Sequence, residues 1–235
     1  MSQAAAELVK QASLRIMAAR ILAQQRWPYI SSLLFTLRLV PVTDGSLSTM
    51  AVDDRWRLYF APDFVLEQGP EPLATVLIHE AMHCLHSHAS RYAALHQPQE
   101  HRVYWNYAAD AAINSVLDDA KMPWPSIEPV RYRDLASFGV AEGMITESAF
   151  FALADYASRH PRQVEWMHDC GSGAGGSPRS YELRDNDGTY PAATRDHQDN
   201  IRDRVAHDII SHAKSVGSVP AGLLRWAEEL FSPPQ

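Results

Sequence analysis

The sequence has few of the features that mark secreted, membrane-spanning or nucleic-acid-coating proteins. Only 2 of its 235 residues are cysteines, which is too few for a disulfide framework and fits a reducing compartment. Lys and Arg total 21 against 28 Asp and Glu, and this formal net charge of −7 argues against a surface built to coat nucleic acid or an anionic membrane. No apolar run approaches the roughly 20 residues that span a bilayer, and residues 1–20 interleave charges with alanine and leucine, unlike a secretory signal. We therefore expect a cytoplasmic protein that binds neither nucleic acid nor membrane.

The apolar spacing predicts an α+β fold that is mostly helical and forms a single domain over residues 1–235. A strand at 38–42 and a hairpin of 47–52 and 56–60 predict a small antiparallel sheet, packed on the helix that follows it. A Gly- and Ser-rich stretch at 160–195 predicts a long loop, and such loops are often functional. The predicted helices are an N-terminal helix within 1–25, one from Glu71 to about Ala94, two more at 104–120 and 146–159, and C-terminal helices within 197–231.

Histidine is concentrated in one part of the chain. Of the 11 histidines, 6 fall between positions 79 and 101, and the first two belong to the motif His79-Glu80-Ala81-Met82-His83. Residues four apart on a helix lie one above the other, so both imidazoles can bind one Zn²⁺. Glu80 is offset around the helix and can take a proton from a water on the metal without being a ligand. The motif predicts zinc-dependent hydrolysis with Glu80 as general base. The alternative is an ordinary core helix that carries histidines.

A catalytic zinc usually has three protein ligands and one position open to water. Asp110 is the best candidate for the third ligand, because Asn106, Asp110 and Asn114 form a polar stripe at spacing four on an otherwise small and apolar helix. Asn106 and Asn114 would then orient the ligands. In the alternative, Asp110 caps a helix or forms a salt bridge, and the third ligand comes from Asp118, Asp119, Glu100 or His101.

Two further histidines follow the motif. Glycine at 86 and histidine at 89 would mark a metzincin, but these positions hold His86 and Ala89, which excludes that subclass. His86 shares the face of His79 but lies about 10 Å further along the helix axis, so we expect it beside the ligands or at the rim of the site. His88 points to the opposite face, and we expect a structural or surface role for it.

Other residues are candidates for supporting roles. Tyr107 and His168 are candidate donors to an oxyanion. Cys170, close to His168 in the Gly- and Ser-rich stretch, is a candidate fourth ligand that would hold the enzyme latent, and the alternative is an uninvolved thiol. The strand at 47–52 would pair with an extended peptide substrate, or else be an ordinary sheet edge.

Several motifs follow one another in a specific order over roughly residues 30–231. They are His79-Glu80-Ala81-Met82-His83 with His88 and Arg91, then Trp105-Asn106 to Asp110 and Asn114, then Gly171-Ser172-Gly173-Ala174, and finally Val219 to Glu228. This ordered set resembles the bacterial metallopeptidase domain that is found ahead of a von Willebrand factor A-like domain. The resemblance implies a zincin-like fold, a metallopeptidase activity and pairing with a MoxR-type AAA+ ATPase. It also implies a C-terminal von Willebrand factor A-like domain that this chain lacks.

The residues and the resemblance together predict a metallopeptidase with one catalytic Zn²⁺, which acts on a protein or peptide substrate. The alternative is a non-catalytic, zinc-stabilised scaffold or adaptor that works with an AAA+ ATPase. The two differ at Glu80, which has a chemical role only in the peptidase.

Overall fold

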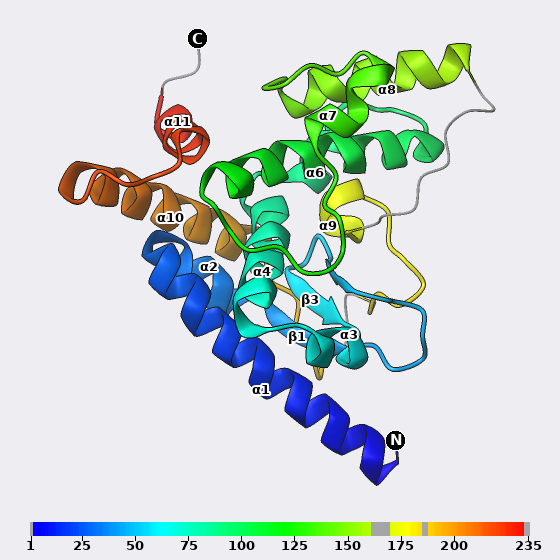
Figure 1. Cartoon of the computed structure of the whole chain (residues 1–235), viewed down its shortest axis with the longest axis vertical. Coiled ribbons are helices and arrows are strands. Elements are labelled where there is room, and N and C mark those ends of the chain that lie inside the picture. Colours follow the sequence, from blue (N-terminus) through cyan, green and yellow to red (C-terminus); the bar gives the residue numbers. More distant parts are fainter. Residues whose placement is uncertain (1, 161–169, 185–187, 233–235) are drawn as a thin grey trace.

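The computed structural model describes residues 2–160, 170–184 and 188–232. Helices predominate, as expected, and a small sheet lies beside the central helix α4 (Figure 1). In chain order, with η for 3₁₀ helices, the elements are α1 (Gln3–Arg26), η1 (Pro28–Ile30), α2 (Ser31–Thr36), β1 (Arg38–Pro41), β2 (Met50–Val52), β3 (Arg57–Phe60), α3 (Pro62–Glu67), α4 (Pro70–Leu85), α5 (His88–Ala94), η2 (Gln99–His101), α6 (Arg102–Asp119), α7 (Tyr132–Leu135), η3 (Ala136–Phe138), α8 (Thr146–Arg159), α9 (Ser172–Gly175), α10 (Arg195–Ser215) and α11 (Ala221–Leu230).

The strands of the described residues form one mixed sheet in the order β1-β3-β2. β2 and β3 are antiparallel, as the predicted hairpin requires. β1, however, runs parallel to β3, so the prediction of a purely antiparallel sheet is wrong. The reason is that residues 42–49 carry the chain past β3 to its far edge before β2 begins, which leaves the other edge of β3 to β1. β2 is therefore an edge strand, and it contacts α4.

The helix α4 is the centre of the fold (Figure 1). α1 packs along it, and α2, α6 and β2 also contact it. The buried side chains of α1 are mostly small, with Ala12, Ala19 and Ala23 fully buried, which lets α1 and α4 approach closely. α4 itself is buried over almost its whole length from Leu73 to Leu85, as expected for a helix that is apolar on most sides. None of the described helices has both the length and the apolar composition that crossing a membrane requires.

α4 ends at Leu85, and does not continue to Ala94 as the sequence predicts. Ser87 has a φ of 53°, a left-handed conformation that is uncommon for residues other than glycine, and α5 starts in a new direction after it. Neither glycine nor proline marks this break, so the sequence pattern does not reveal it. The break turns His88 back toward α4, and His88 is buried rather than exposed on the far face.

α6 lies between the main core and a second hydrophobic cluster. Its Ile113 and Leu117 belong to the main core, whereas Trp105 packs with Phe150 of α8 in the second cluster. Arg91 of α5 lies over the Trp105 ring at 5.6 Å from its centroid. Packing on both sides fixes the position of α6 relative to α4.

A buried ion pair joins the sheet to a later part of the chain. Asp53 and Arg57 are almost fully buried, and Asp53 Oδ2 accepts hydrogen bonds from Arg57 Nε at 2.5 Å and from the Tyr59 hydroxyl at 2.9 Å. Arg57 Nη2 also donates to the Leu183 carbonyl at 2.7 Å. These contacts satisfy both buried charges and hold residues 181–184 against β3.

Replacing Asp53 should therefore be costly. We expect Asp53→Ala to lower the free energy of unfolding by about 3–5 kcal/mol, because Arg57 is left as an uncompensated buried charge. Asp54→Ala is the matched control: the Asp54 side chain lies 3.6 Å from Arg55 at the surface, and its loss should cost no more than about 0.5 kcal/mol. Urea unfolding followed by circular dichroism measures both values, and equal losses would contradict the assigned role of Asp53.

Candidate metal centre

α4 and α6 lie side by side and place three polar side chains against one another. His79 and His83, one turn apart on α4, bring their Nε2 atoms to 3.1 Å. Asp110 of α6 faces them, with Oδ1 at 3.2 Å from His83 Nε2 and 3.7 Å from His79 Nε2. All three residues are buried. The structure thus brings together the three residues that the sequence predicts as ligands.

The contacts of His79 fix which of its ring nitrogens carries the proton. Asn114 Nδ2 donates to the Val130 carbonyl at 2.8 Å, so Asn114 Oδ1 is free to accept from His79 Nδ1 at 2.7 Å. Burial lowers the pKa of His79 to about 4, although Asp110 opposes this shift, and the ring is neutral near pH 7. A neutral imidazole with its proton on Nδ1 directs the lone pair of Nε2 at His83 and Asp110.

His83 has an outer partner of the same kind. Its Nδ1 lies 3.0 Å from Nδ1 of His88, the residue that the break after α4 turns inward. Burial holds the pKa of His88 well below its usual range, so His88 is neutral and its Nδ1 can accept a hydrogen bond from the N–H at His83 Nδ1. His83 Nε2 then presents a lone pair to the same point as His79 Nε2.

The third side chain is also oriented from behind. Asn106, one turn before Asp110 on α6, donates from Nδ2 to Asp110 Oδ2 at 3.2 Å. The backbone N–H of Cys170 donates to Asn106 Oδ1 at 3.4 Å. The stripe of Asn106, Asp110 and Asn114 therefore faces α4, with one amide against Asp110 and the other against His79.

The donor set fits a zinc ion. Lone pairs of two imidazoles and a carboxylate that point at one another in a buried space are costly unless a cation lies between them. Nitrogen and oxygen ligands of a tetrahedral zinc lie about 3.3–3.6 Å apart, and the three separations here are 3.1, 3.2 and 3.7 Å. Cys170 Sγ joins them, and the ligand atoms of the four residues all lie within 4.8 Å of one another.

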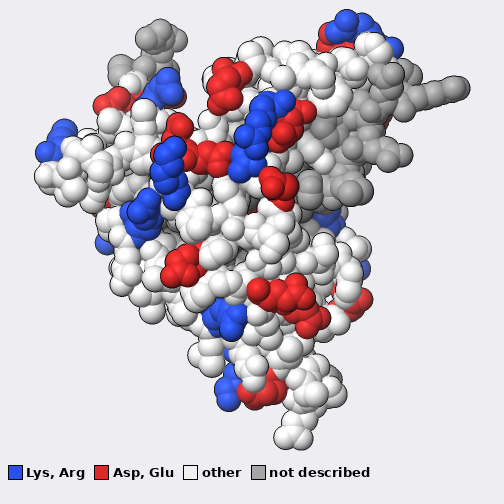
Figure 2. All heavy atoms as spheres, in the orientation of Figure 1, with Lys and Arg blue, Asp and Glu red and all other residues white. Residues whose placement is uncertain are grey.

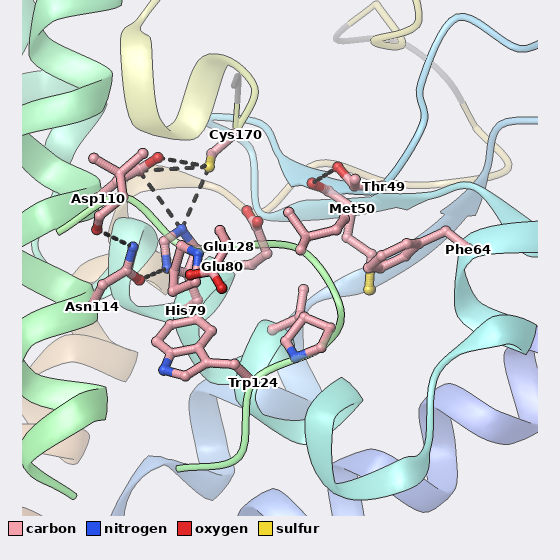
Figure 3. Close-up of a pocket in the computed structure, with 15 residues that line it drawn as sticks. Thr49, Met50, Phe64, His79, Glu80, Asp110, Asn114, Trp124, Glu128 and Cys170 are labelled. Carbon is pink, nitrogen blue, oxygen red and sulfur yellow. Dashed lines mark hydrogen bonds and ion pairs between the residues drawn. The ribbon is translucent and has the colours of Figure 1, made fainter. Parts of the chain in front are cut away.

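A pocket of about 110 Å³ opens beside this cluster (Figure 3). His79, Glu80 and Asp110 line it on one side, and Glu80 is itself buried, so a carboxylate that is not part of the cluster faces the same space. The remaining lining is mostly apolar. It consists of Thr49, Met50, Phe64, Val76, Asn114, Trp124, Pro125, Ile127, Glu128, Pro129, Val130 and Cys170.

The other predicted site residues lie elsewhere. His86 has its ring 5.7 Å from those of His88 and Trp226, so the contact to a ligand that was expected of His86 is made by His88 instead. Tyr107 belongs to the second hydrophobic cluster and is not among the residues that line the pocket. His168 lies outside the described residues.

The alternative third ligands are also placed. Asp118 accepts hydrogen bonds from Arg131 at 2.6 Å and from Trp124 at 2.7 Å. Asp118 thus holds Trp124, which lines the pocket, and Asp118 is not part of the four-residue cluster. Of the four alternatives to Asp110 that the sequence leaves open, none joins the cluster among the described residues.

Comparison with known families agrees with this arrangement. The model of a family described as "Putative metallopeptidase domain" matches residues 11–234. The chain belongs to this family. The matched range of the metallopeptidase domain includes α4, α6 and all four residues of the cluster. Searches of curated proteins and of solved structures gave no match. The family and the cluster together fit a metal-dependent peptidase.

Sequence reasoning missed two parts of this site in the metallopeptidase domain. The contact of His88 with His83 depends on the unmarked break at Ser87, although His88 is one of the residues that carry the family resemblance. The pocket wall formed by residues 124–130 comes from an irregular, proline-bearing segment with no periodic pattern. Only its order in the chain, directly after α6, places it near α4.

Asn114 gives a test of the metal centre that does not remove a ligand. We expect Asn114→Ala to weaken zinc binding about 10- to 100-fold, because His79 loses the partner that fixes its tautomer and orientation. Ser115 lies next to Asn114 on α6, and Ser115→Ala, which removes only an exposed hydrogen bond to Glu142, should leave the affinity unchanged. Competition with a chromogenic chelator measures both affinities, and equal zinc binding by the two variants would contradict the assigned role of Asn114.

Proposed function

We propose that this protein is a zinc-dependent peptidase with a zincin-like active site. His79, His83 and Asp110 hold one Zn²⁺, and Glu80 is the general base. The observation that carries the proposal is that His79, Glu80 and Asp110 share one wall of an apolar pocket, with the ligand nitrogens of both histidines turned to Asp110.

A zinc ion held in this cluster would polarise a peptide carbonyl and would lower the pKa of a bound water toward about 7. The residues of the chain then divide the remaining work. Glu80 takes a proton from the attacking water and delivers it to the nitrogen of the leaving amine. Asn114 and His88 hold the two imidazoles with their Nε2 atoms toward the centre, so no reorientation is needed during the reaction.

The pocket indicates the kind of substrate. Its lining by Met50, Phe64, Trp124 and Ile127 suits an apolar side chain of a peptide, placed next to Glu80. β2 lies at the edge of the sheet, and Met50 of this strand lines the pocket, so an extended peptide can pair with the strand and present its side chain there. The substrate that fits is therefore an unfolded or extended protein segment with an apolar residue beside the scissile bond.

One observation favours a second function, a non-catalytic and zinc-stabilised scaffold or adaptor. Cys170 Sγ lies with the three ligand residues, and structural zinc sites have four protein ligands. In a scaffold Glu80 has no chemical role. The two functions therefore differ in what happens when Glu80 is replaced.

The proposed partners rest on the resemblance alone, and the proposed location rests on the composition of the sequence. We propose a cytoplasmic protein that works with a MoxR-type AAA+ ATPase and a von Willebrand factor A-like domain. On the face shown in Figure 2, Lys and Arg are interspersed with Asp and Glu, so this face offers no continuous basic surface to nucleic acid. This agrees with the net charge of −7.

Glu80→Gln tests the proposed chemistry. We expect it to keep one zinc per chain and the stability of the wild type, and to lower peptide hydrolysis about 10²- to 10⁴-fold, the usual contribution of a general base. Glu71→Gln, in the first turn of the same helix, is the control and should keep full activity. The assay is cleavage of a fluorogenic peptide library with apolar residues at each position. Wild-type hydrolysis that Glu80→Gln leaves intact would contradict the role of Glu80.

A further inference from the structure

Cys170 occupies the position of a fourth metal ligand. Its Sγ lies 3.5 Å from His79 Nε2 and 3.6 Å from each carboxylate oxygen of Asp110 (Figure 3). A sulfur about 2.3 Å from a tetrahedral zinc lies about 3.5 Å from nitrogen and oxygen ligands. The sulfur therefore lies at the distances from His79 and Asp110 that coordination of one zinc ion requires, and within 4.8 Å of the ligand nitrogen of His83.

The backbone of Cys170 is held at this place from two sides. Its N–H donates to Asn106 Oδ1, the same amide that orients Asp110. Its carbonyl accepts from the backbone N–H of Val52 in β2 at 3.1 Å. The thiol thus enters the cluster on a backbone that is attached to both α6 and the edge strand.

Residues 170–175, named here the Cys170 segment, lie directly against β2. A Cβ on Gly171 would be 2.3 Å from the Val52 carbonyl oxygen, and one on Gly173 would be 2.8 Å from Val52 Cγ2. Gly171 also has a φ of +82°, which side chains rarely permit. Ser172 anchors the segment further, because its N–H donates to Glu182 and its Oγ accepts from the Asp54 N–H. Glycine is required at both positions for the segment to lie this close.

The segment therefore occupies part of the edge strand that the proposed peptidase would offer to a substrate. The Val52 N–H, which an extended peptide would use, is taken by Cys170. On a zinc ion held by His79, His83 and Asp110, the thiol would occupy the position that a catalytic zinc keeps open.

We propose that the Cys170 segment is an intramolecular latch: Cys170, as a thiolate that has released its proton to solvent, is the fourth ligand of the metal, and the enzyme is latent until the segment leaves β2. This inference rests on the proposed function.

One feature favours a latch over a permanently closed structural site. The pocket with Glu80 and its apolar wall stands ready beside the cluster, and a structural zinc site makes no use of either.

Cobalt substitution tests the ligand without any assay of activity. We expect the Co²⁺ form of the wild type to show a near-ultraviolet thiolate-to-cobalt charge-transfer band, and Cys170→Ala to lose the band while still binding one Co²⁺ per chain. Cys84→Ala is the matched control, since Cys84 is the other cysteine and is buried outside the cluster, and it should keep the band. A wild type without the band, or a band that persists in Cys170→Ala, would overturn the assignment of Cys170 as a ligand.

Peptide hydrolysis then tests the latch. Cys170→Ala should hydrolyse the peptide at least about tenfold faster than the wild type, because the thiol is removed. A tenfold change corresponds to about 1.4 kcal/mol in activation free energy. Gly171→Ala should raise the rate too, because the new Cβ pushes the segment off β2 while the thiol remains. Gly45→Ala is the control for backbone strain, as Gly45 has a φ of +80° with no atom within 4 Å of the added Cβ, and it should match the wild type. The melting temperature of each variant, with and without zinc, shows that all of them fold.

The outcomes separate the two proposals. Loss of the cobalt band together with a rise in hydrolysis that Glu80→Gln abolishes supports the latch. Loss of the band with hydrolysis unchanged or reduced overturns the latch and leaves Cys170 as a permanent ligand. If none of the variants cleaves any peptide, the proposed function and the latch both fail, and the cobalt spectra still decide whether Cys170 binds the metal.

Discussion

The packing of α4 against α6 is the constraint on which the rest of the site depends. It buries His79 and His83 from one helix opposite Asp110 from the other, beside the pocket that His79 and Asp110 line. Such a group of polar atoms destabilises a fold unless a cation compensates it. The apolar packing on both sides of α6 and the small residues of α1 behind α4 supply the rigidity that keeps these side chains together.

Around this centre each polar group has an outer partner with a defined role. Asn114 fixes the proton of His79, His88 faces Nδ1 of His83, and Asn106 holds the carboxylate of Asp110. The same Asn106 also holds the backbone of Cys170. Orientation of the ligands and position of the Cys170 segment are thus coupled through one amide, so movement of the segment also changes the surroundings of Asp110.

Much of the geometry follows from local periodicity in the sequence. Spacing of four on one helix aligns His79 with His83, and the same spacing aligns Asn106, Asp110 and Asn114, so the two faces that meet can be found without a structure. The break at Ser87 is different, because a left-handed serine has no composition signal, and it moves His88 from the predicted far face into contact with His83. The parallel pairing of β1 and the return of Cys170 to β2 depend on contacts between distant residues, which periodicity does not encode.

The central claim is that one metal ion lies between α4 and α6, bound by His79, His83 and Asp110. X-ray diffraction from crystals of the zinc-loaded protein, recorded on both sides of the zinc absorption edge, tests it most directly. The account predicts a single anomalous peak about 2.0–2.2 Å from Nε2 of both histidines and from an oxygen of Asp110. A peak at another set of residues, or zinc bound by the histidines with Asp110 turned away, would contradict it.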